Sequence, residues 1–283
     1  MIVLISYVFA SALSIGTVSV DGVSVIKLCA GLALVVQWLS FVPAYLKQTE
    51  RFYDLTGSLT YIVCTLIALV GANALTPRAL LLASFVMVWA TRLGLFLSRR
   101  VHKDGGDGRF DELKPRLFSF LTAWNLQGFW VFITASAAWT GILSTQAVPL
   151  RGVDALGIGL WVIGFSIEVI ADQQKRQHRA TLGPARFIQS GLWRYSRHPN
   201  YFGEILLWVG VALIALPTLS GWLYASLFSP IFVAFLLTKI SGIPLLEARA
   251  QERWGDDPDY QAYVASTSQL IPRRPRAPSP EQR

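Results

Sequence analysis

Residues 23–46, VSVIKLCAGLALVVQWLSFVPAYL, form an apolar run that is long enough to cross a lipid bilayer as a helix. Lys27 is the one charged residue in this run. Runs of the same character recur along the chain at residues 2–18, 57–75, 79–97, 118–141, 155–171, 201–216 and 221–240. The sequence therefore predicts an all-α protein, a polytopic transmembrane helical bundle with seven or eight spans.

The composition agrees with a membrane protein. Of 283 residues, 53% are hydrophobic and only 15% are charged, whereas soluble domains usually carry about a quarter charged residues. The formal net charge of +8 would suggest nucleic acid as the partner of a soluble protein. In a membrane protein, this positive charge is better explained by basic loops. Such loops fix the topology and face anionic lipid or an anionic cofactor, so we expect no nucleic-acid partner.

The first apolar run, residues 2–18, allows two interpretations. It resembles the apolar part of a signal peptide, but it lacks a charged segment before it and a clear small-x-small cleavage site. We therefore expect a retained first helix and eight spans. Without that helix the bundle has seven spans and the same sidedness elsewhere.

The basic residues are distributed very unevenly between the loops. If the N-terminus lies inside, 21 of the 25 Lys and Arg residues fall in segments that are also inside. These inner segments are residues 47–56, 98–117, 172–200 and the tail after residue 240, taken with Lys239. This bias predicts that both termini are cytoplasmic. We expect one membrane-embedded domain over residues 1–271 and a disordered basic tail over 272–283.

Ionisable side chains inside predicted spans are costly in lipid and are therefore candidate functional groups. Glu168 and Asp172 lie four residues apart, on one helical face, and Arg176 and Arg179 continue that face. Glu204 lies just inside the seventh span. These acids and arginines predict a polar pocket at the inner leaflet, although arginines at a helix end can also simply anchor topology.

Residues 191–204, GLWRYSRHPNYFGE, predict a re-entry into the membrane. Pro199 starts a helix whose first turn presents Asn200 and Tyr201, a place suited to anions. Arg194, Arg197 and His198 precede this helix at headgroup level. The chain has no G-x-G-x-x-G after a strand, no phosphate-binding P-loop and no H-x-x-H or H-E-x-x-H pattern, so we expect no metal site and no soluble nucleotide-binding fold.

At RHPNYFGE the sequence resembles the steroid 5α-reductase-like family, in particular its bacterial branch of unassigned substrate (DUF1295-type). The stretches 171–179, ADQQKRQHR, and 241–263, SGIPLLEARAQERWGDDPDYQAY, support the resemblance, as do residues 50–62 and 91–114. The resemblance implies a reductase-like part over about 115–271, a cytosol-facing cavity that holds NADPH and a hydrophobic substrate that enters from the bilayer. It also implies the bacterial inner membrane as the location.

The resemblance further implies roles for individual residues. It implies that nine residues bind the cofactor: Asp172, Arg176, Arg179, Arg194, Arg197, His198, Asn200, Tyr201 and Glu204. In the animal steroid reductases a glutamate and a tyrosine polarise the substrate ketone. Glu50, Tyr53 and Asp54 lie near the corresponding helix end and are the candidate catalytic residues, although the local pattern differs.

A second resemblance competes with the first. Isoprenylcysteine carboxyl methyltransferases carry a similar R-H-P-x-Y-x-G element, which they use for S-adenosylmethionine. The Asn of HPNY, the following FGE and the charged helix end at 172–179 favour the reductase. We therefore predict an NADPH-dependent oxidoreductase that reduces a carbon–carbon double bond, an enone, in a steroid-like or other lipid. The alternative is an S-adenosylmethionine-dependent membrane methyltransferase.

A third possibility is a helical membrane scaffold or transporter. The sequence shows neither the inverted repeats nor the interrupted midplane helices that are typical of transporters. The expected partners are thus a hydrophobic small molecule from the bilayer and membrane lipid, with no obligate protein partner.

Overall fold

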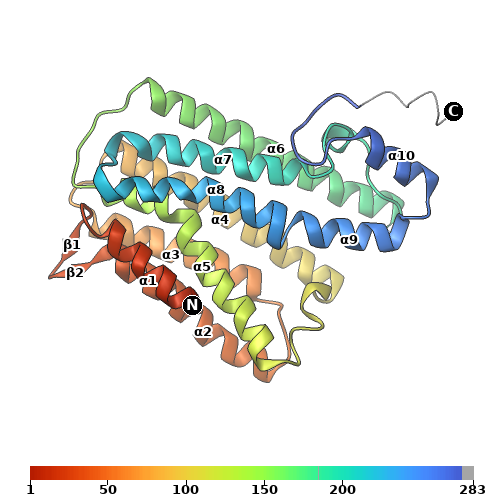
Figure 1. Cartoon of the computed structure of the whole chain (residues 1–283), viewed down its shortest axis with the longest axis horizontal. Coiled ribbons are helices and arrows are strands. Elements are labelled where there is room, and N and C mark those ends of the chain that lie inside the picture. Colours follow the sequence, from red (N-terminus) through yellow and green to blue (C-terminus); the bar gives the residue numbers. More distant parts are fainter. Residues whose placement is uncertain (184, 276–283) are drawn as a thin grey trace. The chain divides into compact units, whose positions relative to one another are not determined.

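A computed structural model describes residues 1–183 and 185–275 of the chain and is mainly helical (Figure 1). Seven of the helices in this described part are long and apolar enough to cross a membrane. The all-α polytopic prediction is confirmed, and the chain is an integral multi-pass membrane protein. Residues 276–283 of the predicted disordered tail lie outside the described residues.

The helix at the start of the chain is shorter than the sequence suggested. Helix α1 spans Ile2–Leu13 and has 12 residues. At 1.5 Å per residue it reaches only about 18 Å, less than the hydrocarbon thickness of about 30 Å. The seven long helices therefore match the lower of the two predicted span counts.

A two-stranded antiparallel hairpin follows α1, with β1 at Ser19–Val20 and β2 at Val23–Ser24. Asp21 and Gly22 form the turn, and both have positive φ, +48° and +77°. Asp-Gly is the usual sequence for a two-residue turn with two left-handed positions. The hairpin leads directly into α2.

The chain divides into two compact units, and the first comprises Met1–Ala155 and Val211–Ser229. Its long helices are α2 (Val25–Leu46), α3 (Tyr53–Gly71), α4 (Pro77–Asp104) and α5 (Leu117–Ile142). The predicted single domain over residues 1–271 stays a prediction.

Buried polar side chains link the helices of the first unit. Gln37 of α2 donates to the Thr60 hydroxyl of α3 at 2.9 Å, and the Trp139 indole of α5 donates to the Thr65 hydroxyl at 3.0 Å. Such bonds join helices where lipid offers polar groups no alternative partner.

The second unit comprises Leu156–Gly210 and the chain from Pro230 onward. It contains most of α6 (Gly152–Leu182), α7 (Pro199–Ala215) and α8 (Phe228–Phe235), and also α9 (Ile243–Trp254) and α10 (Pro258–Ser266). A π-helical turn at Leu236–Ile240 follows α8. The seventh of the long apolar helical segments is Gly221–Trp254, which includes α8, this turn and α9. Helix α6 continues well past residue 171, where the apolar run ends, so the charged segment that follows is helical.

Helices α6 and α7 lie side by side in Figure 1, and glycines allow their backbones to touch. A Cβ at Gly203 would lie 2.5 Å from the carbonyl oxygen of Gly164, and one at Gly210 would lie 2.5 Å from that of Gly157. Small residues at such positions are typical of tightly packed membrane helices. This contact sets the distance between the two helices that carry most of the predicted cofactor residues.

Candidate cofactor site

The close packing of α6 and α7 brings the predicted acidic and amide groups together. A Cβ at Gly203 would also lie 2.7 Å from the backbone nitrogen of Glu168, so the first turns of α7 lie against the part of α6 that carries Glu168 and Asp172. Asn200, in the first turn of α7, donates from Nδ2 to the Asp172 carboxylate at 3.3 Å. Glu168, Asp172 and Glu204 are all buried. The structure thus assembles a polar cluster from residues that lie far apart in the sequence.

The loop that precedes α7 is fixed to α6 by its tryptophan. The Trp193 indole donates to the carbonyl oxygen of Ala171 at 3.0 Å, and the Gln174 side chain accepts from the backbone N–H of Leu192 at 2.9 Å. Gly191 has φ +62°, and a Cβ there would lie 2.4 Å from the Gln174 amide. Glycine is therefore required at this turn, which directs the chain into the RHPNY segment, residues 197–201.

The C-terminal segment of the chain holds the RHPNY segment from another side. The backbone N–H of Arg197 donates to the Ser268 carbonyl at 2.8 Å, and the Ser196 hydroxyl donates to the Leu270 carbonyl at 2.7 Å. The Ser196 oxygen also accepts from the backbone N–H of His198 at 3.1 Å. Residues 268–270 are therefore part of the framework of the site.

Glu247 of α9 contacts both Arg197 and His198. Its carboxylate oxygens lie 2.7 Å from Arg197 Nη1 and 2.7 Å from His198 Nε2. The His198 ring stacks on the Tyr201 ring, with centroids 5.7 Å apart and an interplanar angle of 8°. Glu247 lies in the stretch 241–263, and nothing in its local sequence marks it as a site residue.

The environment of His198 favours its neutral form. Burial lowers the pKa of His198, and the nearby charges of Lys175 and Arg197 lower it further. The hydrogen bond and charge of Glu247 act in the opposite direction but do not outweigh burial, so the pKa lies below its usual value. His198 is therefore uncharged at neutral pH.

The predicted phosphate-binding arginines are placed differently from the acids. Arg176, Arg179 and Arg194 are exposed, and Arg176 donates to the Gln173 side chain at 2.5 Å. Arg197 is the exception, because Glu247 holds it. The three exposed arginines lie on the same segments of the chain as the buried acids and amide, Arg176 and Arg179 on α6 and Arg194 just before α7.

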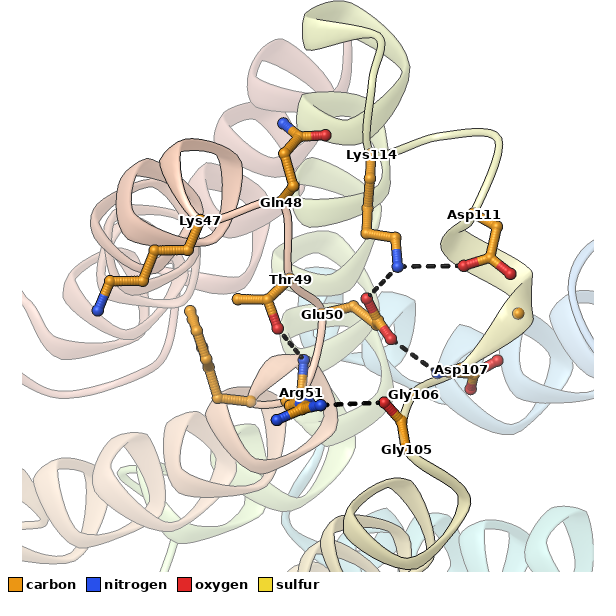
Figure 2. Close-up of a pocket in the computed structure, with 12 residues that line it drawn as sticks. Lys47, Gln48, Thr49, Glu50, Arg51, Gly105, Gly106, Asp107, Asp111 and Lys114 are labelled. Atoms are coloured by element: carbon orange, nitrogen blue, oxygen red, sulfur yellow. Dashed lines mark hydrogen bonds and ion pairs between the residues drawn. The ribbon is translucent and has the colours of Figure 1, made fainter.

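The N-terminal candidates lie in the first unit, where Glu50 lines a pocket of about 750 Å³ shown in Figure 2. Glu50 is buried, and its two carboxylate oxygens accept from Lys114 Nζ and from the backbone N–H of Asp107, each at 2.7 Å. Lys114 also contacts Asp111 at 3.1 Å. Burial lowers the pKa of Lys114, but the hydrogen bonds and charges of Glu50 and Asp111 outweigh it and raise the pKa overall.

Tyr53 and Asp54 also have protein partners. The Tyr53 hydroxyl donates to the carbonyl oxygen of Ala123 at 2.9 Å, and Asp54 lies 3.9 Å from Arg109 Nη2. The three candidate catalytic side chains thus lie in one region, and each has a contact that stabilises the fold locally. Their catalytic role stays a prediction.

A family model described as "Protein of unknown function (DUF1295)" matches residues 40–267, a range that includes every predicted site residue. The chain belongs to the DUF1295 family. Membership confirms the resemblance to steroid 5α-reductase-like proteins that the RHPNYFGE stretch indicated.

Three of the curated relatives that this DUF1295 chain matches carry reductase or dehydrogenase names. It is 38% identical over 84 residues to a very-long-chain enoyl-CoA reductase of Dictyostelium discoideum, covering 29% of this chain and 27% of the relative. It is 30% identical over 163 residues to a 3-oxo-5-alpha-steroid 4-dehydrogenase 1 of Bos taurus, covering 53% and 54%. The rat protein of the same name is 30% identical over 117 residues, covering 41% and 40%. The chain thus matches about half of these relatives' lengths or less, and no solved structure matches it.

Proposed function

We propose that the protein is a membrane-embedded, NADPH-dependent reductase of a carbon–carbon double bond in a hydrophobic substrate. The observation that carries the proposal is the second-unit cluster in which Asn200 contacts Asp172 beside buried Glu168 and Glu204. The names of the relatives, an enoyl-CoA reductase and two steroid dehydrogenases, support the same class of reaction.

The residues of the cluster suit a dinucleotide. Asp172 and Glu204 offer carboxylate acceptors for hydroxyl or amide groups, and Asn200 offers both a donor and an acceptor. The exposed guanidinium groups of Arg176 and Arg179 suit phosphates, which arginine binds in a bidentate manner. NADPH, when bound, supplies the hydride for the reduction.

The chain's own contribution is to bind and orient. The contact between α6 and α7 fixes the carboxylates relative to Asn200, and the burial of the acids strengthens each polar interaction with a ligand. The hydrophobic helices give a lipid-like substrate access from the bilayer. We propose that the cofactor cavity faces the cytosol at the inner membrane of a bacterium, with both termini cytoplasmic, as the distribution of Lys and Arg indicates.

Ligand binding to the purified full chain in detergent tests the proposal. Titration calorimetry with NADPH, NADH and S-adenosylmethionine is expected to show saturable binding of NADPH, weaker binding of NADH and none of the methyl donor. The NADPH preference has a physical reason, since exposed arginines bind the additional phosphate. Saturable binding of S-adenosylmethionine without NADPH binding would instead establish the methyltransferase alternative.

A further inference from the structure

Glu247 joins two neighbouring residues of the RHPNY segment through one carboxylate. Its oxygens lie 2.7 Å from Arg197 Nη1 and 2.7 Å from His198 Nε2. The side chains of Arg197 and His198 are 13% and 6% exposed, whereas that of Glu247 is 27% exposed. Glu247 therefore holds both residues from the more exposed side of the contact.

This contact determines which nitrogen of His198 carries the proton. An ionised carboxylate can only accept hydrogen bonds, so Nε2 of His198 must be the donor. In a neutral imidazole with its proton on Nε2, Nδ1 carries a lone pair and is an acceptor. The low pKa of His198 agrees with a neutral ring; the charged groups that face it are Glu247 from α9, Lys175 from α6 and its neighbour Arg197.

Two polar atoms held by this arrangement have no partner among the residues that the structure describes. His198 Nδ1 and Arg197 Nε are both buried and form no hydrogen bond within residues 1–183 and 185–275. Most buried polar atoms in proteins are paired, and a functional role is one explanation for an exception. The pair consists of one acceptor and one donor, the complement of a ligand group that both donates and accepts.

We propose that Glu247 is a positioning residue that fixes the proton of His198 on Nε2 and so presents Nδ1 as a buried acceptor for an N–H or O–H group of the bound dinucleotide. The inference rests on the proposed function for the identity of the ligand. The donor is either the carboxamide N–H of the nicotinamide or a ribose hydroxyl, and Arg197 Nε is a second contact for the same ligand.

Binding measurements on four variants test this arrangement. Glu247→Ala and His198→Ala are each expected to weaken NADPH binding about tenfold, the usual effect of losing one hydrogen bond from a buried site. Glu247→Gln keeps an acceptor for Nε2 and is expected to stay within about threefold of the wild type. Arg249→Ala is the matched control, because Arg249 is an exposed residue of the same helix α9. Wild-type affinity in Glu247→Ala would overturn the proposal.

An analogue of NADPH identifies the donor group. The 3-acetylpyridine analogue lacks the carboxamide N–H but keeps the ribose hydroxyls. If the carboxamide donates to Nδ1, the analogue binds wild-type protein about tenfold more weakly than NADPH and binds His198→Ala with the same affinity as NADPH. If a ribose hydroxyl donates, His198→Ala weakens both ligands equally. Either outcome supports an acceptor at Nδ1 and locates its partner.

The tautomer can be observed without any ligand, which separates this inference from the proposed function. Nitrogen-15 NMR of histidine-labelled protein in detergent is expected to show a neutral His198 with the proton on Nε2. The resonance is assigned by its loss in His198→Ala, since the chain has only three histidines. Glu247→Gln should keep this tautomer, and Glu247→Ala should give a mixture. A proton on Nδ1 in the wild type would refute the inference, whether or not NADPH binds.

Discussion

Replacing Gly203 by alanine tests whether the close contact between α6 and α7 builds the site. The added Cβ would lie 2.5 Å from the Gly164 carbonyl oxygen, 2.7 Å from the Glu168 nitrogen and 3.2 Å from the Glu168 Cα. All three atoms belong to the backbone, so no side chain can rotate away to relieve the contact. The two helices must therefore separate or rotate.

The size of the effect follows from these distances. Ordinary contacts between a Cβ and another heavy atom begin at 3.4 Å, so a separation of 2.5 Å from the Gly164 oxygen requires a local shift of roughly 1 Å. Overpacking of this kind costs about 1–3 kcal/mol, which lowers the melting temperature by roughly 2–10 °C for a protein of this size. The same shift moves Asp172 away from Asn200, so NADPH affinity should fall as well.

Thermal unfolding in detergent and NADPH titration on the same samples measure both effects. Gly159→Ala is the control, because Gly159 lies on α6, the helix that Gly203 of α7 packs against, and its Cβ would meet no atom of the described residues within 4 Å. The control is expected to melt and to bind like the wild type. If Gly203→Ala matched the control in both measurements, the glycine contact would not position the site.

Three further predictions concern the other polar clusters. Glu50→Gln removes the charge paired with Lys114 and should lower the free energy of unfolding by about 1–3 kcal/mol in thermal melts; lost turnover with unchanged stability would support a catalytic role instead. Arg78 and Asp154 form a buried ion pair at 2.7 Å. Arg78→Met leaves Asp154 buried without this partner and should lower the free energy of unfolding by about 3–5 kcal/mol, and adding Asp154→Leu to the same protein should restore part of the loss. An Arg78→Met protein that melts like the wild type would contradict this. The pKa of His198 is lowered by folding, so its contribution to stability is complete above its usual pKa of about 6.5 and is lost as the pH falls through the lower folded-state value. Measured melts of His198→Gln should therefore decline less in acid than those of the wild type, and equal declines would refute the shift.

The long helices were predictable because every backbone N–H and C=O group in lipid needs a hydrogen bond within the protein, which makes a long apolar run helical. The apolar runs identified the seven long helices, including α2, whose observed bounds Val25–Leu46 nearly match the run at 23–46. Their ends were less predictable. Helix α6 extends to Leu182 because its final turns, although charged, still form backbone hydrogen bonds outside the apolar phase. Hydropathy measures where a helix can lie in lipid and says nothing of where it ends in water.

The site was partly predictable for a similar reason. Asp172 drew attention because ionisable groups near lipid require partners, and Asn200 because it lies in the first turn of the helix that Pro199 starts; the structure pairs them. Glu247 was missed because it lies 49 residues from His198, on a helix where an exposed acid is unremarkable. The sequence pointed to Glu247 only indirectly. The largely buried Arg197 and His198 require an acidic partner, but the sequence alone does not say which acid of the chain supplies it.

The central claim is that the cluster around Asp172 and Asn200 binds NADPH. The most direct test compares equilibrium NADPH binding to the wild-type chain, Asn200→Ala and the control Arg249→Ala, each reconstituted in lipid nanodiscs, by the fluorescence of the reduced nicotinamide. We expect saturable binding by the wild type and the control, and binding about tenfold weaker in Asn200→Ala. Equal affinity in all three proteins, or no NADPH binding by the wild type, would contradict the claim.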